Sequence, residues 1–155
     1  MVLSDEFIQS CILDGKALPE DFLLQLQLKP TKLGHRGSQM EVGGDSGRQY
    51  EIRLRQSAID PLAFSVILSV VPEEGPRVFR LRRYNGRSHG HRNLIESTRL
   101  VCGFHIHYAT ERYQLAGFTE DAYAEASDRY ANIWQALECL IADCGFRDSR
   151  PPLLF

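Results

Sequence analysis

Three segments with the patterning of β-strands constrain the fold of this chain more than any other feature, and they lie at residues 50–55, 62–71 and 78–84. In the first and third runs, apolar side chains alternate with polar or charged ones, which is the period of two of a half-buried strand. The second run is apolar on both faces, as in a central strand. Because the connections between the runs are too short for a crossover helix, the three strands are predicted to be antiparallel neighbours.

Helical patterns flank these strands on both sides. The first helix is predicted over residues 5–14, with Ser4 as its N-cap and Gly15 at its end. The last helix is predicted to begin after Asn132, whose side chain and Gln135 form a start like a capping box, and to end at Gly145. We therefore expect an α+β fold in which an antiparallel sheet of four to five strands packs with an N-terminal and a C-terminal helix.

The length of 155 residues fits one domain, spanning residues 1–155. Residues 30–47 carry five glycines, so we expect a flexible loop there with at most a short strand at 39–42. An extended tail is expected at residues 149–155, where two prolines follow each other. The other predicted segments are a strand at 24–28, which a helical turn over 19–23 could precede, a loop at 85–96, a strand at 100–108 and a stretch at 110–126 that is irregular or briefly helical.

Composition limits the cellular setting. No apolar run approaches the roughly 20 residues that a membrane-spanning helix needs. The first residues lack a basic segment followed by an apolar one, so no signal peptide is expected and we predict a cytoplasmic protein without membrane contact. An exported toxin that uses another route would have the same features. The four cysteines form no C-x-x-C pair, which argues for buried free thiols rather than a zinc or thioredoxin-type motif.

Arginine is concentrated in one part of the chain. Between Arg77 and Asn93 there are six arginines and no Asp or Glu, although the net charge of the whole chain is −2. Arginine suits bidentate contacts with phosphate or carboxylate groups. We expect Arg80, Arg82 and Tyr84 to share the outer face of their strand, which would then be a basic platform for anions. The alternative is a solvated strand surface that resists edge pairing. The same alternation on the neighbouring strands adds Arg53, Arg55, Ser65 and Ser69 to this face.

Histidine is concentrated beside the arginines. Four of the five histidines form two H-x-H pairs, His89 with His91 and His105 with His107. Residues two apart on a strand point to the same face, so His105 and His107 should project together. We expect the loop after Tyr84 to fold back so that imidazoles and guanidiniums share one solvent-open pocket.

Three interpretations of the histidines remain open. In the first, they transfer protons between a 2′-hydroxyl and a 5′-oxygen without a metal, while arginines hold the phosphate, as in a ribonuclease. In the second, three histidines bind zinc or another transition metal, with Glu96 or Glu111 as a fourth ligand or a base. In the third, the histidines only brace the loop.

The first interpretation assigns a role to each candidate residue. Proton transfer is predicted for His91, His105 and His107. Substrate binding is predicted for Arg80, Arg82, Tyr84, Arg87, His89 and Arg112. The tyrosines near these residues suit stacking on unpaired bases and equally suit a protein interface. No phosphate-binding loop, dinucleotide fingerprint or hydrolase elbow motif occurs, so no cofactor is expected. The first interpretation needs no metal, and we adopt it for the predicted site.

Two motifs carry a resemblance to known families. The run RYNGRSHGHRN at 83–93, followed by FHIHYATERY at 104–113, resembles an uncharacterised family of small bacterial proteins, and the similarity continues through 123–124 and 128–130 into the last helix. The order of the motifs is also similar to TumE-type toxins of toxin–antitoxin pairs, whose pattern has Asp where Asn85 stands and Lys where Ile106 stands. The resemblance implies a bacterial or phage setting and a two-gene defence or addiction module.

These observations lead to one functional prediction and one alternative. We predict a toxin-like RNA-binding protein or metal-independent ribonuclease of a defence or toxin–antitoxin module, with RNA or another phosphate-bearing ligand and a cognate antitoxin as partners. The alternative is a non-catalytic interaction module, such as an antitoxin, an anti-defence inhibitor or an adaptor, that docks an acidic partner through the arginine-rich face. The sequence leaves open whether the protein is an enzyme.

Overall fold

The structure is a computed structural model that describes residues 1–87, 90–100 and 103–148. The main sheet is built from β2 (Lys29–Pro30), β3 (His35–Gly43), β4 (Gln49–Ser57), β5 (Phe64–Val71), β6 (Phe79–Asn85), β9 (His105–Tyr108) and β10 (Tyr123–Ala126). The helices are α1 (Asp5–Leu13), α2 (Phe22–Gln25), α3 (Glu111–Leu115) and α4 (Ile133–Asp143). Two small strand pairs complete the fold: β1 (Lys16–Ala17) lies parallel to β11 (Phe146–Arg147), and β7 (His91–Asn93) forms an antiparallel hairpin with β8 (Thr98–Leu100).

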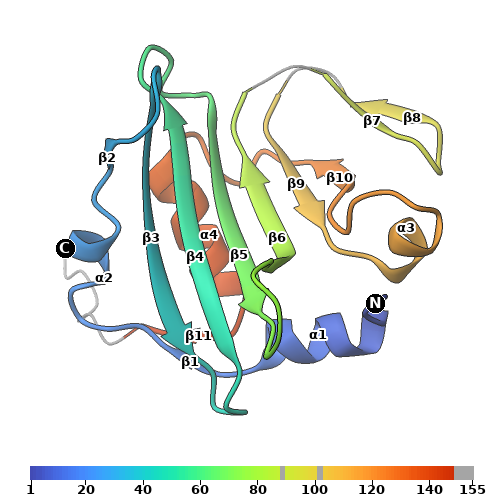
Figure 1. Cartoon of the computed structure of the whole chain (residues 1–155). Coiled ribbons are helices and arrows are strands. Elements are labelled where there is room, and N and C mark those ends of the chain that lie inside the picture. The colour runs from blue at the N-terminus through green and yellow to red at the C-terminus, as the bar shows by residue number, and fades with distance from the viewer. Residues whose placement is uncertain (88–89, 101–102, 149–155) are drawn as a thin grey trace.

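The predicted α+β class with a mainly antiparallel sheet is confirmed. Within the described residues, the main sheet has seven strands in the order β10-β9-β6-β5-β4-β3-β2, and each neighbouring pair is antiparallel. The expectation of four to five strands was therefore too small. Figure 1 shows α4 behind the sheet and no helix in front of β3 to β6, so one face of these strands is uncovered. The β7–β8 hairpin and α3 lie beside β9 and β10.

The short strand predicted at 39–42 is present, but it is part of the longer β3, so the predicted loop at 30–47 was wrong for most of its length. Every residue of β3 pairs with β4, from His35 opposite Ser57 to Gly43 opposite Gln49. Only Met40 and Val42 of this strand are buried. Pairing with the neighbouring strand therefore stabilises β3, and its own sequence has little of the apolar alternation that identifies a strand.

The predicted strand at 24–28 was also wrong. Phe22 and Leu26 are fully buried, whereas Leu24 between them is 68% exposed. A spacing of four brings side chains to one side of a helical turn, so α2 satisfies the apolar residues better than a strand would. β7 lies in the predicted loop at 85–96 and β10 in the stretch at 110–126, and neither strand was predicted. The brief helix expected as one option at 110–126 is confirmed by α3, and the strand predicted at 100–108 is shortened to β9.

Both terminal helices begin and end close to their predicted bounds. The Ser4 hydroxyl accepts a hydrogen bond from the backbone N–H of Phe7, and the Asn132 side chain accepts one from Gln135. Gly145 follows α4 with a φ of 77°, a backbone conformation that favours glycine at a helix end. Buried residues of both helices and of the covered sheet face form one apolar core. In the parts of the chain described here, no helix has the length and apolar character of a membrane span.

A bulge in β6 decides which side chains reach each face of the sheet. Ser69 pairs with Arg80 and Leu68 pairs with Arg82, so Leu81 is an extra residue on β6. Beyond it the alternation is reversed, and Arg82 and Tyr84 lie on the covered face opposite Leu68 and Val66. The prediction that Arg82 and Tyr84 share the outer face with Arg80 was therefore wrong. Arg83 and Asn85 occupy the uncovered face instead.

Candidate functional site

Four polar side chains form a row across the uncovered face of the sheet. Arg55 on β4 pairs with Ser65 on β5, Ser65 with Asn85 on β6, and Asn85 with His105 on β9. Paired residues on adjacent strands share a face, so the four side chains are direct neighbours. The Ser65 hydroxyl donates to Asn85 Oδ1 at 2.8 Å, and Asn85 Nδ2 lies 3.5 Å from His105 Nε2. We call this set the polar row.

Three histidines gather at the β9 end of the polar row. The ring centroids of His105 and His107 are 4.9 Å apart, and the ring of His91 on β7 lies 5.8 Å from the first and 4.8 Å from the second. His91 stacks on His105 with an interplanar angle of 16°. Both histidines of the second predicted H-x-H pair and His91 of the first pair thus lie in a single cluster, which we call the histidine cluster. His89, the remaining predicted member, lies outside the described residues.

Backbone carbonyls fix the tautomers of two of these histidines. His105 Nδ1 lies 2.9 Å from the Gly103 oxygen, and His107 Nδ1 lies 2.7 Å from the Asp121 oxygen. A carbonyl only accepts, so both Nδ1 atoms carry the proton and donate it. In the neutral rings, Nε2 is therefore the atom with a free electron pair.

His91 is held by an asparagine that has only one suitable orientation. Asn93 Nδ2 donates to the Ala124 oxygen at 2.8 Å, and its Oδ1 accepts from the Ala124 N–H at 2.9 Å. His91 Nε2 lies 3.0 Å from the same Oδ1 and must therefore carry a proton. Asn93 thus joins the β7–β8 hairpin to β10 and orients His91 toward the cluster.

The expectation of a solvent-open pocket was wrong for two of the three histidines. His105 and His107 are each only 4% exposed. Burial lowers the pKa of the His105 imidazole, and burial next to the Arg83 guanidinium lowers the pKa of His107 to about 2. Both rings are neutral near pH 7, which suits a proton acceptor and excludes His107 as an acid at that pH. His91 is half-buried.

The charges nearest the cluster are already paired. Arg83 pairs with His107 in the sheet register, and its Nε lies 3.1 Å from Asp121 Oδ2. Arg80 lies 3.4 Å from the other oxygen of the same carboxylate and 3.6 Å from Glu120. Asp121 is 1% exposed, so these two arginines neutralise a buried carboxylate. Arg80 was predicted to bind substrate, and this pairing reduces its availability for that role.

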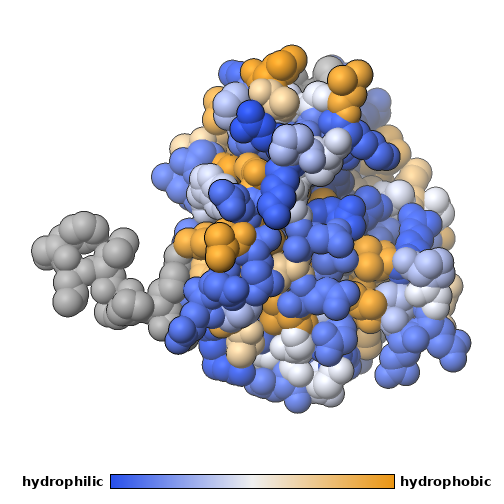
Figure 2. Space-filling view, turned by 60° about the vertical axis from the view of Figure 1, so that its left-hand side comes forward, coloured by the Kyte–Doolittle hydropathy of each residue, from blue (hydrophilic) through white to orange (hydrophobic). Residues whose placement is uncertain are grey.

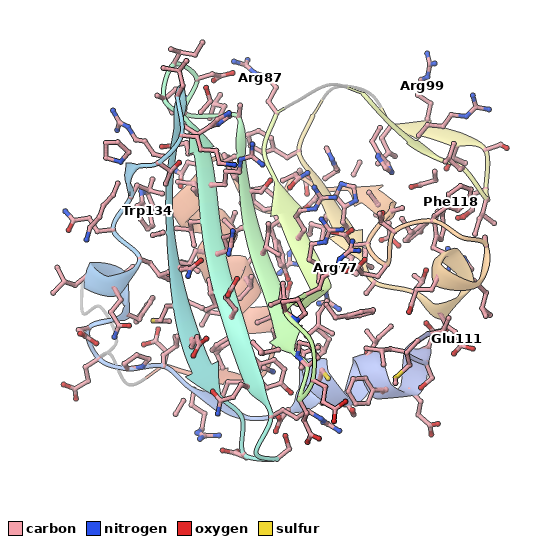
Figure 3. The ribbon with its side chains drawn as sticks, in the orientation of Figure 1. Arg77, Arg87, Arg99, Glu111, Phe118 and Trp134 are labelled. Atoms are coloured by element: carbon pink, nitrogen blue, oxygen red, sulfur yellow. The ribbon has the colours of Figure 1, made fainter. Side chains whose placement is uncertain are left out.

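The other predicted substrate-binding residues lie in separate places. Arg82 stacks on Tyr108 at 4.9 Å from the ring centroid, and Tyr84 is fully buried with its hydroxyl donating to Asp143 at 2.6 Å. Arg87 pairs with Asp60 at 3.4 Å, and Arg112 pairs with Glu96 at 3.2 Å. Figure 3 shows Arg87 at the end of the sheet and far from Arg99 on the hairpin and from Arg77. The predicted arginines therefore do not surround the histidines.

A groove with basic side chains lies at the other end of the polar row. It has a volume of about 400 Å³ and contains no Asp or Glu among its lining residues, which are Thr31, Lys32, His35, Arg36, Gly37, Ser38, Gln39, Arg53, Leu54 and Arg55. We call it the basic groove. A smaller pocket of about 180 Å³ shares His35 and Arg55 with it and is also lined by Ser65 and Asn85. The basic groove is thus continuous with the polar row.

Two features of the basic groove indicate a ligand site. Among the described residues, Arg53 is paired with Glu51, whereas Arg55 and Lys32 have no ion-pair partner. His35 Nδ1 is buried and has no hydrogen-bond partner in the described chain. Arg55 was predicted for the outer face, but Lys32, His35 and Arg36 were missed because they lie in the segment that we expected to be a flexible loop.

Metal binding was the second interpretation of the histidines. In residues 1–87, 90–100 and 103–148, no group of three His, Cys, Asp or Glu side chains is arranged to hold a metal ion. Glu96 accepts hydrogen bonds from Arg112 and Tyr113, and Glu111 accepts one from the Asp5 backbone.

The chain matches no family model, no curated protein and no solved structure.

Proposed function

We propose that this protein binds single-stranded RNA through its phosphates, along the uncovered face of the sheet. The observation that supports the proposal is the continuity between the basic groove, which has no acidic lining residue, and the polar row that leads from Arg55 to His105. The setting that we propose, a bacterial or phage defence or toxin–antitoxin module, comes from the resemblance of the histidine motifs.

The dimensions and chemistry of this face suit an extended polyanion. Adjacent strands are about 4.8 Å apart, so the three steps from Arg55 to His105 extend about 14 Å, which exceeds a single phosphate group. Arg55 and Lys32, which form no ion pair with any residue that the structure describes, supply charge. The Ser65 hydroxyl and Asn85 amide supply neutral hydrogen bonds beside it. Phosphate contacts of this kind give affinity without sequence selectivity.

Charge reversal in the basic groove tests the binding proposal. The fluorescence anisotropy of a labelled single-stranded RNA is measured at low salt with the wild type, with Arg55→Glu and with Arg77→Glu as the matched control. Arg77 is also exposed but lies outside the groove. We expect Arg55→Glu to weaken binding about tenfold or more, because a charge-assisted contact becomes a repulsion, and Arg77→Glu to have little effect. Equal binding by the two variants, or no binding by the wild type, would contradict the proposal and favour an acidic protein partner.

Cleavage of the bound RNA without a metal is a second candidate function, and the histidine cluster is the observation that favours it. His105 Nε2 can accept the proton of a 2′-hydroxyl as that oxygen attacks phosphorus, and the His91 imidazole can give a proton to the leaving 5′-oxygen. The products are a 2′,3′-cyclic phosphate and a free 5′-hydroxyl. Because His105 is buried, the substrate reaches its Nε2 only after the β7–β8 hairpin moves away.

The cleavage candidate has its own test. Labelled RNA is incubated with the wild type, His91→Ala and His105→Ala in the presence of EDTA, with Arg77→Ala as a control variant outside both the histidine cluster and the basic groove. Loss of the cyclic-phosphate product in the first two variants, with retention in the third, supports cleavage by the cluster. Wild-type protein that binds RNA but leaves it intact restricts the function to binding. Activity that requires an added metal supports the metal interpretation.

A further inference from the structure

A second surface, remote from the histidines, has the character of a docking site. It is a groove of about 720 Å³ between α2 and the first turns of α4, lined by Leu23, Leu24, Gln27, Asn132, Trp134, Gln135 and Glu138. Leu24 is 68% exposed and Trp134 is 41% exposed. Figure 2 turns this side of the molecule toward the viewer and shows apolar side chains at the surface. Figure 3 labels Trp134 on the same side. We call this the α2–α4 groove.

The exposure of these apolar residues is not needed for folding. The buried stripe of α4, which includes Ala136, Leu137 and Leu140, already packs in the core. Trp134 lies outside that stripe, and Leu23 and Leu24 lie beside the buried Phe22 of α2. A cluster of exposed large apolar side chains marks an interaction surface or a binding groove.

The described chain stops close to this groove. The oxygen of Arg147 in β11 accepts a hydrogen bond from the Leu18 backbone N–H at 3.0 Å, and Leu18 lies only five positions before Leu23. The residues after Asp148 are SRPPLLF, at positions 149–155. Seven residues span up to about 23 Å when extended. A segment that follows Asp148 is therefore long enough to reach and cover the α2–α4 groove.

The chemistry of the segment fits the groove. Pro151-Pro152 favours the polyproline conformation, whose ordering on binding costs little entropy. Proline-rich segments dock in grooves lined by aromatic side chains, and Trp134 supplies such a side chain here. Leu153, Leu154 and Phe155 supply apolar groups to cover Leu23 and Leu24.

We propose that residues 151–155 dock in the α2–α4 groove of the same chain and cover Trp134. The docked segment is an intramolecular strap from β11 to α2 and α4, and it shields the apolar surface from other proteins. This assignment is independent of RNA binding, because the groove shares no lining residue with the basic groove or the polar row.

The single tryptophan of the chain is a direct reporter of docking. A variant that ends at Asp148 is compared with the full chain by tryptophan emission and acrylamide quenching. We expect removal of the segment to shift the emission to longer wavelength and to increase the quenching constant. A synthetic SRPPLLF peptide added to the shortened protein should reverse both changes. Far-ultraviolet circular dichroism checks that the shortened protein is folded.

A paired substitution keeps the test decisive if the shortened protein does not fold. In the full chain, Leu154→Ser with Phe155→Ser should reproduce the spectral changes, whereas Ser149→Ala should not. Identical spectra and quenching constants for all variants would overturn the proposal. A dependence of the emission on protein concentration, with dimers in sedimentation, would also overturn it by showing that a second copy covers the groove.

Discussion

The Lys16 ammonium donates a hydrogen bond to the backbone oxygen of Cys144 at 2.7 Å and so joins the ends of the two terminal helices. The same ammonium donates to the Cys11 oxygen at 2.6 Å and to the Asp14 oxygen at 2.7 Å. Lys16 is fully buried, and its burial lowers the pKa of the ammonium. The last carbonyls of a helix have no partner within the helix, and a cation at that end is favourable.

Replacing Lys16 with Met should destabilise the protein strongly. The side chain is of similar length, but the three carbonyl oxygens that lie 2.6–2.7 Å from the ammonium lose this donor. Each unsatisfied group costs at least about 1 kcal/mol. We expect a loss of about 3 kcal/mol in the free energy of unfolding, measured by urea denaturation. Lys29→Met is the matched control, because Lys29 is exposed. Equal stability of the two variants would show that water replaces the ammonium.

Stability should fall as the pH drops below neutrality. The pKa of His107 is lowered from 6.5 to about 2 in the folded protein, so the unfolded chain binds the extra proton between these values. Stability is therefore complete above about pH 6.5 and declines by up to about 1.4 kcal/mol per pH unit below it. Thermal unfolding of the wild type and His107→Gln between pH 7 and about pH 4.5, above the range where most carboxylates titrate, measures this slope. The variant should have a flatter profile, and parallel profiles would refute the assignment.

Gly86 should not tolerate even a methyl group. A Cβ at this position would overlap the Leu62 oxygen and lie 2.6 Å from two ring carbons of Phe64. The backbone of the turn at Leu62 and the Phe64 ring would both have to shift, so Gly86→Ala should cost about 2–3 kcal/mol. Gly47→Ala is the contrast: nothing lies within 4 Å, and the φ of 92° alone should cost about 1 kcal/mol. Thermal unfolding compares the two variants, and a smaller effect at Gly86 would show that β5 adjusts.

The salt dependence of RNA binding should report the role of Arg55. Each phosphate contact in a single strand contributes about 0.7 to the slope of log affinity against log salt concentration. Arg55→Ala should therefore reduce the slope by about 0.7, while Arg77→Ala leaves it unchanged. Anisotropy titrations at several salt concentrations provide the slopes. An unchanged slope in Arg55→Ala, with weaker binding, would mean that Arg55 acts through the fold and not through a phosphate.

Local sequence information was sufficient for the elements whose stability is mainly local or strongly patterned. The N-cap and apolar stripe of α4 identify it from its own residues, and the alternation in β4 and the apolar run in β5 identify those strands. By contrast, β3 and the short strands β7 and β10 depend on partners elsewhere in the chain. Their residues show little periodicity, because pairing with a neighbour supplies most of their stabilisation.

The candidate site was predictable in part for the same reason. The H-x-H spacing on β9 placed His105 and His107 on one face, as the pairing with Asn85 and Arg83 shows. Their cover could not be predicted, since it depends on the hydrogen bonds between Asn93 and Ala124, which are 31 residues apart. The carboxylates of Glu120 and Asp121, which pair with Arg80 and Arg83, likewise lie far along the sequence from these arginines. Glu96, which pairs with Arg112, follows the arginine-rich stretch.

The bulge at Leu81 sets the faces of every residue that follows it in β6. If the strand ran through Leu81 without the bulge, regular alternation from Arg80 would turn Tyr84 toward the uncovered face and Asn85 into the apolar interior. Both the contact with Asp143 and the link to His105 would then be lost together. Relatives that keep Tyr84 and Asn85 in their present places should therefore have either the bulge or a strand that is one residue shorter between Arg80 and Asn85.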